Sequence, residues 1–250
     1  MYGGESARSF ALNSLRRRLI ANRSAHLLTM FVAAISSAEA AQPLVTDDAA
    51  VLAPKTCQLE AWARSAHDGR EYWAQPACNL TGNVELTIGA GRARPDVAEA
   101  STILQLQAKT VLSRLADREW SFGMLAAAGR DIAAPHGSSA FQVYAAKALA
   151  SWYPRSDLEV DVNLGAANAY SAGTFVVAGA DIQYAVISNL QLLAEVFRDQ
   201  PGPGKYQVGA RYIIVPNCVE AYASYANRLN KSSERSVVIG IRVQTAAILP

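Results

Sequence analysis

The chain has 250 residues, of which 51% are hydrophobic and 18% are charged, and this composition is too apolar for a disordered protein. Downstream of residue 41, no unbroken apolar run approaches the ~18 residues that a membrane-spanning helix needs. Such a helix is excluded there, but membrane-spanning strands are not. The formal net charge is +2, yet five of the 23 basic and two of the 21 acidic residues precede Ala41, which leaves 18 against 19. This balance gives no support to nucleic-acid binding, which needs a clustered basic face.

The first 40 residues have the organisation of a secretory signal peptide or leader. Three arginines occupy positions 16–18, residues 27–35 form a short apolar stretch, and Ala38-Glu39-Ala40 is a motif that signal peptidase accepts. We therefore expect cleavage after Ala40 and export through the inner membrane of a Gram-negative bacterium. Residues 41–56 would then form a periplasmic N-terminal segment. The alternative is an amphipathic N-terminal helix that stays on the protein.

From residue 57 onward, the dominant pattern is two-residue alternation in segments of about ten residues. In residues 158–166, Leu158, Val160 and Val162 alternate with polar residues, and a strand would send the two sets to opposite faces, whereas a helix would mix them. Turn-forming pairs such as Asp68-Gly69 separate the segments. The pattern predicts an all-β protein of twelve strands, with ten as the alternative count. Their expected ranges are 57–67, 70–79, 83–93, 101–114, 119–130, 139–152, 157–168, 174–187, 190–199, 206–215, 219–229 and 235–247.

The alternation is compatible with two barrels of opposite orientation. A small soluble barrel encloses apolar side chains, whereas a transmembrane barrel turns them toward lipid and keeps polar side chains in its lumen. The polar face here is rich in glycine, alanine and glutamine, and aromatic residues fall near strand ends, as in interfacial girdles. We therefore predict an antiparallel up-and-down transmembrane β-barrel over residues 57–250. The aromatic residues are Tyr72, Trp73, Trp120, Phe122, Trp152, Tyr153, Tyr170, Tyr206 and Tyr212.

The alternative to this barrel is a periplasmic, lipocalin-like carrier that encloses an apolar ligand, with the aromatic residues at the edge of an ordinary core. In the membrane barrel, the polar face lines the lumen, where it either selects solutes, as charged rings do in pores, or pairs across strands and fills a narrow barrel. The residues expected to face the lumen are Glu60, Arg64, Glu85, Gln105, Gln107, Lys109, Asp161, Asn163, Asp181, Gln183, Glu195, Arg211 and Arg242.

The three cysteines are Cys57, Cys78 and Cys218. Cys57 opens the first expected strand and Cys78 closes the second, and in an antiparallel hairpin these two ends are neighbours. Export permits disulfide formation, so we expect a Cys57–Cys78 disulfide, with two unpaired buried thiols as the alternative.

The sequence contains little that indicates catalysis. The three histidines, His26, His67 and His136, have no metal-ligand spacing among themselves or with the cysteines. No G-x-S-x-G nucleophile motif is present. We expect no enzyme, no cofactor and no metal. An outer-membrane enzyme would need a catalytic couple built on His67 or His136 near one rim of the barrel.

Several segments resemble a group of uncharacterised outer-membrane proteins described as transporters of the "MetA pathway of phenol degradation". They are Pro43-Leu44-Val45-Thr46-Asp47-Asp48-Ala49, Cys57-Gln58-Leu59-Glu60, Trp73, Pro76-Ala77-Cys78-Asn79, Val84-Glu85-Leu86-Thr87-Ile88-Gly89, Leu193-Ala194-Glu195-Val196-Phe197 and Gln244-Thr245. The resemblance implies an outer-membrane barrel for the passage or binding of small molecules, including apolar or aromatic ones. It does not establish phenol as the substrate. The expected partners are outer-membrane lipid, the barrel-assembly machinery and a small-molecule solute, with no nucleic acid.

Overall fold

The computed structural model describes residues 44–96, 100–113, 119–132, 143–169, 172–230 and 235–247. The expected leader over residues 1–40 lies outside these ranges, as do His136 and Tyr170. Within the described ranges, no helix is both long enough and apolar enough to cross a membrane.

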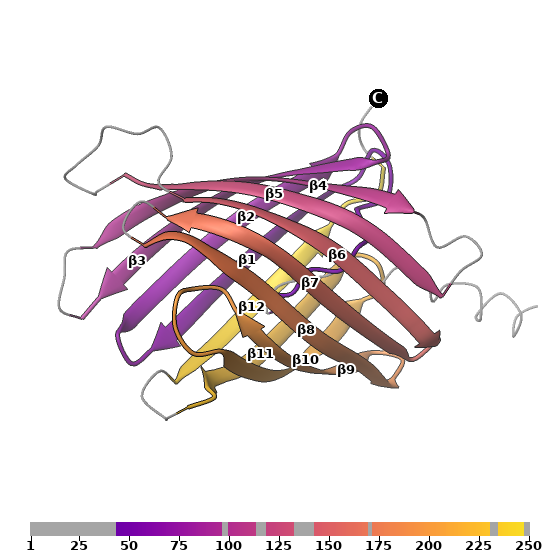
Figure 1. The fold of residues 1–250 in the computed structure, drawn as a ribbon. Coiled ribbons are helices and arrows are strands. Elements are labelled where there is room, and N and C mark those ends of the chain that lie inside the picture. Colours follow the sequence, from indigo (N-terminus) through magenta and orange to yellow (C-terminus); the bar gives the residue numbers. More distant parts are fainter. Residues whose placement is uncertain are drawn as a thin grey trace, which may run out of the picture. The chain divides into compact units, whose positions relative to one another are not determined.

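Twelve strands, each antiparallel to both neighbours, form one closed barrel (Figure 1). Strands β1 and β12 close it by pairing from Gln58 opposite Gln244 to Ala66 opposite Ser236. The predicted fold class and strand count are confirmed, and the ten-strand alternative is wrong. The start expected for the sixth strand, residues 139–142, lies outside the described residues. The strands are β1 (Cys57–Ala66), β2 (Gly69–Asn79), β3 (Val84–Pro95), β4 (Ser101–Ser113), β5 (Trp120–Asp131), β6 (Val143–Arg155), β7 (Leu158–Ala169), β8 (Gly173–Ile187), β9 (Leu190–Arg198), β10 (Lys205–Val215), β11 (Val219–Arg228) and β12 (Ser236–Gln244).

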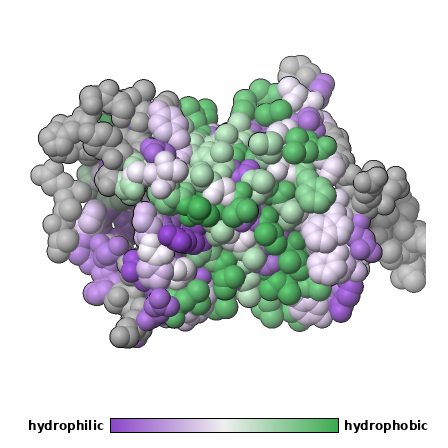
Figure 2. All heavy atoms as spheres, in the orientation of Figure 1, coloured by the Kyte–Doolittle hydropathy of each residue, from purple (hydrophilic) through white to green (hydrophobic). Residues whose placement is uncertain are grey.

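Alternation along the strands sends polar side chains inward and apolar side chains outward. On β7, Glu159 and Asp161 are only 4% and 0% exposed, whereas Val162 and Leu164 are 48% and 62% exposed. Figure 2 shows hydrophobic residues over the middle of the visible outer surface and hydrophilic residues gathered toward its two ends. This orientation is the reverse of the one that a lipocalin-like carrier requires.

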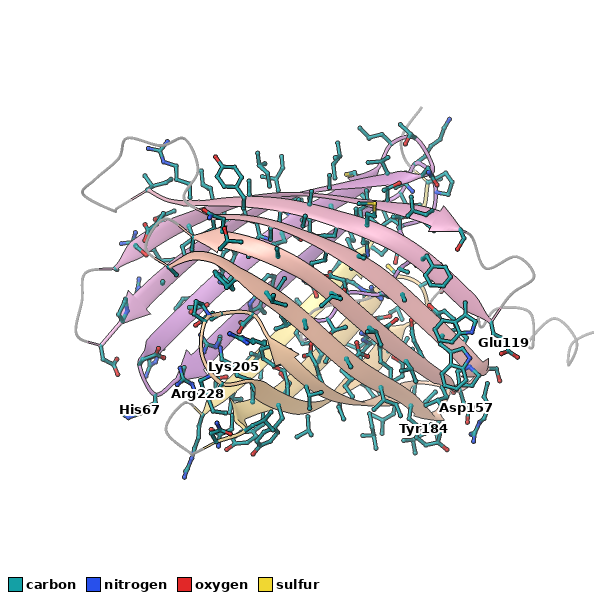
Figure 3. All side chains as sticks on the ribbon, viewed as in Figure 1. His67, Glu119, Asp157, Tyr184, Lys205 and Arg228 are labelled. Carbon is teal, nitrogen blue, oxygen red and sulfur yellow. A yellow bond between two sulfur atoms is a disulfide. The ribbon has the colours of Figure 1, made fainter. Side chains whose placement is uncertain are left out.

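The two ends of the barrel differ in their connections. We call the end where β1 begins and β12 finishes the terminal end, and the opposite one the loop end. At the terminal end, β6–β7 and β8–β9 are joined through residues 156–157 and 188–189 only, whereas at the loop end β5 finishes at Asp131 and β6 begins at Val143, with eleven residues of sequence between them. In Figure 3, Glu119, Asp157 and Tyr184 mark the terminal end, and His67, Lys205 and Arg228 mark the loop end.

Aromatic side chains on the outer surface gather near both ends. At the terminal end, the Trp120 ring stacks on Phe122 and on Trp152, with ring centroids 6.2 and 5.6 Å apart. Tyr72 and Tyr144 are 46% and 52% exposed on the outer surface toward the loop end. Paired belts of this kind suit the two interfaces of a bilayer, where an amphipathic ring sits at headgroup level.

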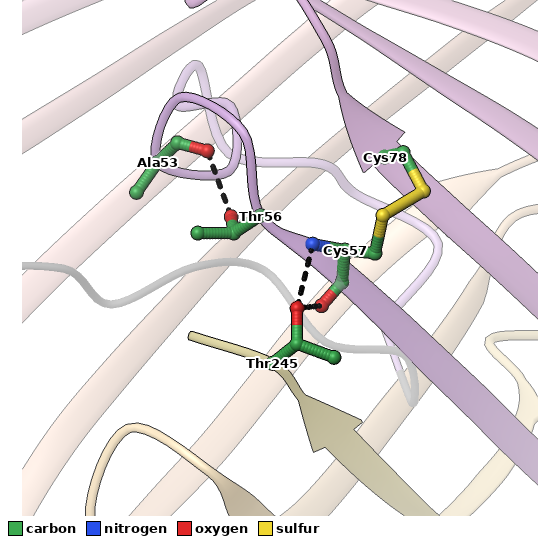
Figure 4. Close-up of a disulfide and its surroundings, with 5 residues drawn as sticks. All are labelled: Ala53, Thr56, Cys57, Cys78 and Thr245. Carbon is green, nitrogen blue, oxygen red and sulfur yellow. Dashed lines mark hydrogen bonds between the residues drawn. A yellow bond between two sulfur atoms is a disulfide. The ribbon is translucent and has the colours of Figure 1, made fainter. Parts of the chain in front are cut away.

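The expected disulfide joins Cys57 to Cys78, and these residues lie directly opposite each other in the β1–β2 register. The hydroxyl of Thr245, after β12, accepts a hydrogen bond from the Cys57 amide at 3.0 Å and donates one to the Cys57 carbonyl at 3.1 Å (Figure 4). The start of β1 is therefore held from both neighbouring strands. The third cysteine, Cys218, is exposed and free.

Candidate functional site: the barrel lumen

All thirteen residues expected in the lumen occupy inward positions of their strands. Arg64, Gln105 and Gln107 are half-buried, and Arg64 donates a hydrogen bond to Glu71 across the β1–β2 pair at 2.9 Å. The other ten are buried: Glu60, Glu85, Lys109, Asp161, Asn163, Asp181, Gln183, Glu195, Arg211 and Arg242. Their burial arises because the wall side chains contact one another and a stretch of chain that runs through the lumen.

That stretch is the segment preceding β1. We call residues 44–56 the inner segment. Its first part lies at mid-barrel height, against Glu195, and its last part meets the wall near the terminal end, where Asn79 donates a hydrogen bond to the Leu52 carbonyl at 2.5 Å. The expectation of a periplasmic segment over residues 41–56 did not foresee this course. Residues 44–52 lie within the barrel, whereas residues 53–55 are exposed at its terminal end.

Backbone amides of the inner segment bind side-chain acceptors of the wall. The amides of Val45 and Thr46 both donate to the Glu195 carboxylate. Their nitrogens lie 3.0 and 2.5 Å, respectively, from Glu195 Oε1. Further along, the Ala49 amide donates to Ser151 Oγ at 2.8 Å, and the Leu52 amide donates to Glu85 Oε2 at 2.9 Å. These wall groups satisfy backbone donors that belong to no strand and would otherwise be buried without partners.

Two aspartates of the inner segment form ion pairs with lysines of the wall. Asp48 Oδ1 lies 3.1 Å from Lys109 Nζ on β4, and Asp47 Oδ2 lies 2.9 Å from Lys147 Nζ on β6. The first pair is almost fully buried, with side-chain exposures of 6% for Lys109 and 0% for Asp48. Buried charges need such partners, because an unpaired ion in a low-dielectric interior is strongly unfavourable.

Small wall residues make room for the inner segment. A Cβ built on Gly179 of β8 would lie 2.1 Å from Thr46 Oγ1, so only glycine allows this approach. A Cβ built on Gly123 of β5 would lie 3.3 Å from the Ala49 carbonyl oxygen. Ala49 itself packs with Leu125 and Leu149, two inward apolar residues, in a small buried cluster. The segment is thus fitted to the wall by shape as well as by charge.

Two cavities remain beside the inner segment. One of about 130 Å³ lies between Leu44, Thr46 and the wall of β1 to β4, and its lining includes Trp62, Trp73 and Gln105. The other, of about 160 Å³, lies between Val45 and the wall of β6 to β9.

The aromatic lining of the first cavity corrects one sequence prediction and adds a residue that the sequence analysis missed. Trp73 was expected in an interfacial girdle, but it lies inside the barrel and stacks on Trp62 with ring centroids 5.7 Å apart. The Trp73 ring also covers Gly91, where a Cβ would lie 2.5 Å from ring atoms. Trp62 shares its strand face with Glu60, two residues away, and this two-residue spacing was the signal available in the sequence.

Tyr153 is a second aromatic residue that lies inside the barrel rather than in a girdle. Its hydroxyl donates a hydrogen bond to Glu159 Oε1 at 2.6 Å. The neighbouring Asp161 accepts hydrogen bonds from Ser151, and from Gln183 at 3.1 Å. This region of the wall is an acidic network, and the sequence analysis found only part of it.

Opposite this network, two arginines share one carboxylate. Arg242 Nη2 donates to Glu220 Oε2 at 2.8 Å, and Arg211 Nε lies 3.7 Å from the same oxygen. Tyr222, on the same strand as Glu220, is buried beside them and covers Gly240, where a Cβ would lie 2.4 Å from its ring. Charges of both signs therefore line the lumen, and much of the wall pairs across strands.

In the part of the chain that the structure describes, no group of three or more His, Cys, Asp or Glu side chains could hold a metal ion. His67 lies exposed in the β1–β2 connection at the loop end, away from the buried carboxylates. The residues of the lumen are suited to hydrogen bonding and ion pairing with a solute or with the chain's own segment.

A closed antiparallel barrel with an apolar outer wall and a polar lumen defines the class of porin-like β-barrels. Within that class, the chain belongs to the family described as "Uncharacterised conserved protein UCP029691", whose model matches residues 28–245. The description of this family does not mention the phenol-degradation group that parts of the sequence resemble. No curated protein matches the chain.

Solved outer-membrane porins share the fold. The KdgM porin in complex with disordered oligogalacturonate is similar with a TM-score of 0.60 and 12% identity, over 76% of this chain and 99% of that one. The NanC porin is similar with a TM-score of 0.53 and 14% identity, over 75% of this chain and 98% of that one. At these identities, the similarity establishes the fold alone.

Proposed function

We propose that this protein resides in a bacterial outer membrane and that its lumen passes or binds small solutes. The observation that carries the proposal is the inversion of polarity across a closed wall: Leu164 is 62% exposed on the outside while Asp161, on the same strand, is fully buried inside. In hydrocarbon every backbone group must be satisfied internally, and closure of the barrel meets that condition. The aromatic belts near both ends support the same location.

The class of solute is supported by the lumen lining. Half-buried indole rings of Trp62 and Trp73 border the same cavity as Gln75, Gln105 and Gln107. Flat rings beside amides suit a solute that has an apolar face and polar edges, such as a sugar or a small aromatic compound. The KdgM porin was solved with an oligogalacturonate, and this supports testing acidic sugars first. The phenol-pathway role implied by the sequence resemblance stays a prediction.

Two experiments test this proposal. Cell fractionation, with comparison of heated and unheated samples on gels, should place the protein in outer membranes as a heat-modifiable barrel, whereas recovery from the soluble periplasm would overturn the location. Proteoliposomes loaded with galacturonate or glucose should then release one of these faster than protein-free liposomes. Equal release of both sugars with and without protein would overturn the transport role.

A further inference from the structure

The inner segment passes through the lumen without joining the barrel wall as a strand. Residues 44–52 lie in none of the twelve strands, and side chains from six strands hold them in place. The holding residues are Asn79 on β2, Glu85 on β3, Lys109 on β4, Lys147 and Ser151 on β6, Asn163 on β7 and Glu195 on β9. The segment is therefore bound by the wall and is not part of it.

The chemistry of these contacts permits the segment to leave. The wall groups that bind it are carboxylates, ammonium groups, amides and the Ser151 hydroxyl, and all of them can hydrogen-bond to water as well as to peptide. Only Leu44, Ala49 and Leu52 of the segment are buried hydrophobic residues. Withdrawal would therefore leave these polar groups to water, and it would also uncover apolar wall residues such as Leu125, Leu149 and Val177.

The space around the segment shows what its withdrawal would do. Leu44 and Thr46 border the cavity against β1 to β4, whereas Val45 borders the cavity against β6 to β9. The same three residues thus separate the two cavities. Removing them joins about 130 Å³ and about 160 Å³ with the volume of the segment itself.

The segment is anchored firmly at its downstream end. The Lys55 amide donates to the Asn79 carbonyl at 2.7 Å, and the Asn79 amide donates to the Thr56 carbonyl at 3.0 Å. The disulfide and Thr245 hold Cys57 directly after it. Movement is therefore confined to residues upstream of this anchor, and the segment can leave the lumen without opening the barrel.

We propose that residues 44–52 are a displaceable plug that closes the conduit of this barrel in cis. The plug is recognised by its backbone amides, through Glu195, Ser151 and Glu85, and by its two aspartates, through Lys109 and Lys147. The conduit opens when the wall groups exchange their contacts with the plug for contacts with water or solute. The strands of the wall do not move in this step. The inference rests on the proposed function, because a plug has meaning only in a barrel that spans a membrane.

Planar-bilayer recording tests the plug directly. Deletion of residues 44–52 from the otherwise full chain should raise single-channel conductance at least about twofold over wild type, because the lumen loses the segment that separates its two cavities. Asp47→Asn/Asp48→Asn should raise the fraction of time spent in the higher-conductance state. Asp157→Asn, the same chemical change at the β6–β7 turn outside the lumen, should leave both quantities at wild-type values.

A disulfide that holds the plug against the wall should have the opposite effect on conductance, and reduction should reverse it. The Cβ of Thr46 lies 3.3 Å from a Cβ built on Gly179, a little below the ~3.5–4.5 Å found in disulfides, and Thr46→Cys removes the Oγ1 atom that excludes a Cβ at this position. Thr46→Cys/Gly179→Cys, in a Cys218→Ser background, should hold the low-conductance state when oxidised and recover openings when reduced. Wild type measured with and without reductant controls for reduction of Cys57–Cys78.

The outcomes separate the two proposals. If neither wild type nor any variant inserts into bilayers or floats with liposomes, the proposed function in a membrane is overturned. Normal insertion with wild-type conductance in both the deletion and the locked variant would overturn the plug alone. If the deletion variant fails to fold, the conductance of the Asp47→Asn/Asp48→Asn variant and of the locked variant tests the plug instead. Wild-type conductance in both would overturn it.

Discussion

The ammonium group of Lys109 lies 3.1 Å from the carboxylate of Asp48, and their side chains are 6% and 0% exposed. This pair joins β4 of the wall to the inner segment, across a separation of 61 residues in the sequence. Burial gives the pair its importance, because neither charge can turn to bulk water when the other is removed.

Lys109→Met should destabilise the folded barrel by about 3 kcal/mol, since it leaves the Asp48 carboxylate buried without its cation. The double variant Lys109→Met/Asp48→Leu should recover most of that loss, because both charges are then gone. Urea unfolding in lipid vesicles, followed by tryptophan fluorescence, measures both. A double variant less stable than Lys109→Met would contradict the pairing.

Leu164 lies near the middle of β7 on the outer surface and is 62% exposed. Leu164→Arg should cost about 2–4 kcal/mol in a lipid bilayer, as for a cation at the bilayer midplane. Ile132, which directly follows β5 at the loop end and is 52% exposed, is the matched position. Ile132→Arg should cost less than about 1 kcal/mol, because it lies near the interface. Equal costs in refolding experiments would show that this surface does not face lipid.

The cysteines should react in a fixed order. Without reductant, maleimide should label one thiol per chain, at the exposed Cys218, and with reductant in denaturant it should label all three cysteines. Replacing Cys57 and Cys78 with serine should lower the free energy of unfolding by about 2–4 kcal/mol, because the unfolded chain loses a cross-link. Three reactive thiols in the untreated protein would exclude the disulfide.

Gly179 tests the fit between the wall and the inner segment. Gly179→Val should displace Thr46, because even a single Cβ there would lie 2.1 Å from Thr46 Oγ1. In a Cys218→Ser background, a cysteine introduced as Thr46→Cys should be protected from maleimide in the parent and should be labelled in the Gly179→Val variant. Gly129→Val is the control, since a Cβ built on Gly129 meets only Leu104 O at 3.6 Å and Val143 Cβ at 4.0 Å. Labelling that is equal in both valine variants would argue against a specific contact at Gly179.

Alternation and turn residues were sufficient to predict the strands, because a side-chain period of two is a local property that survives in any barrel. The pairing of Cys57 with Cys78 followed from the same local reasoning, since one hairpin brings these strand ends together. The error at Trp73 arose from grouping it with its neighbour Tyr72. Successive strand residues face opposite sides, and Tyr72 is exposed outside while Trp73 stacks on Trp62 inside.

The course of the inner segment could not be read from the sequence. Residues 44–56 have no period, and their hydrogen-bond partners are up to 150 residues away along the chain, as with Val45 and Glu195. The sequence by itself determined which residues form strands and which face of each strand is apolar, because both depend on neighbours a few positions apart. Only the tertiary structure decided what fills the lumen, because closing twelve strands into a ring brings distant carboxylates, lysines and glycines around the same stretch of chain.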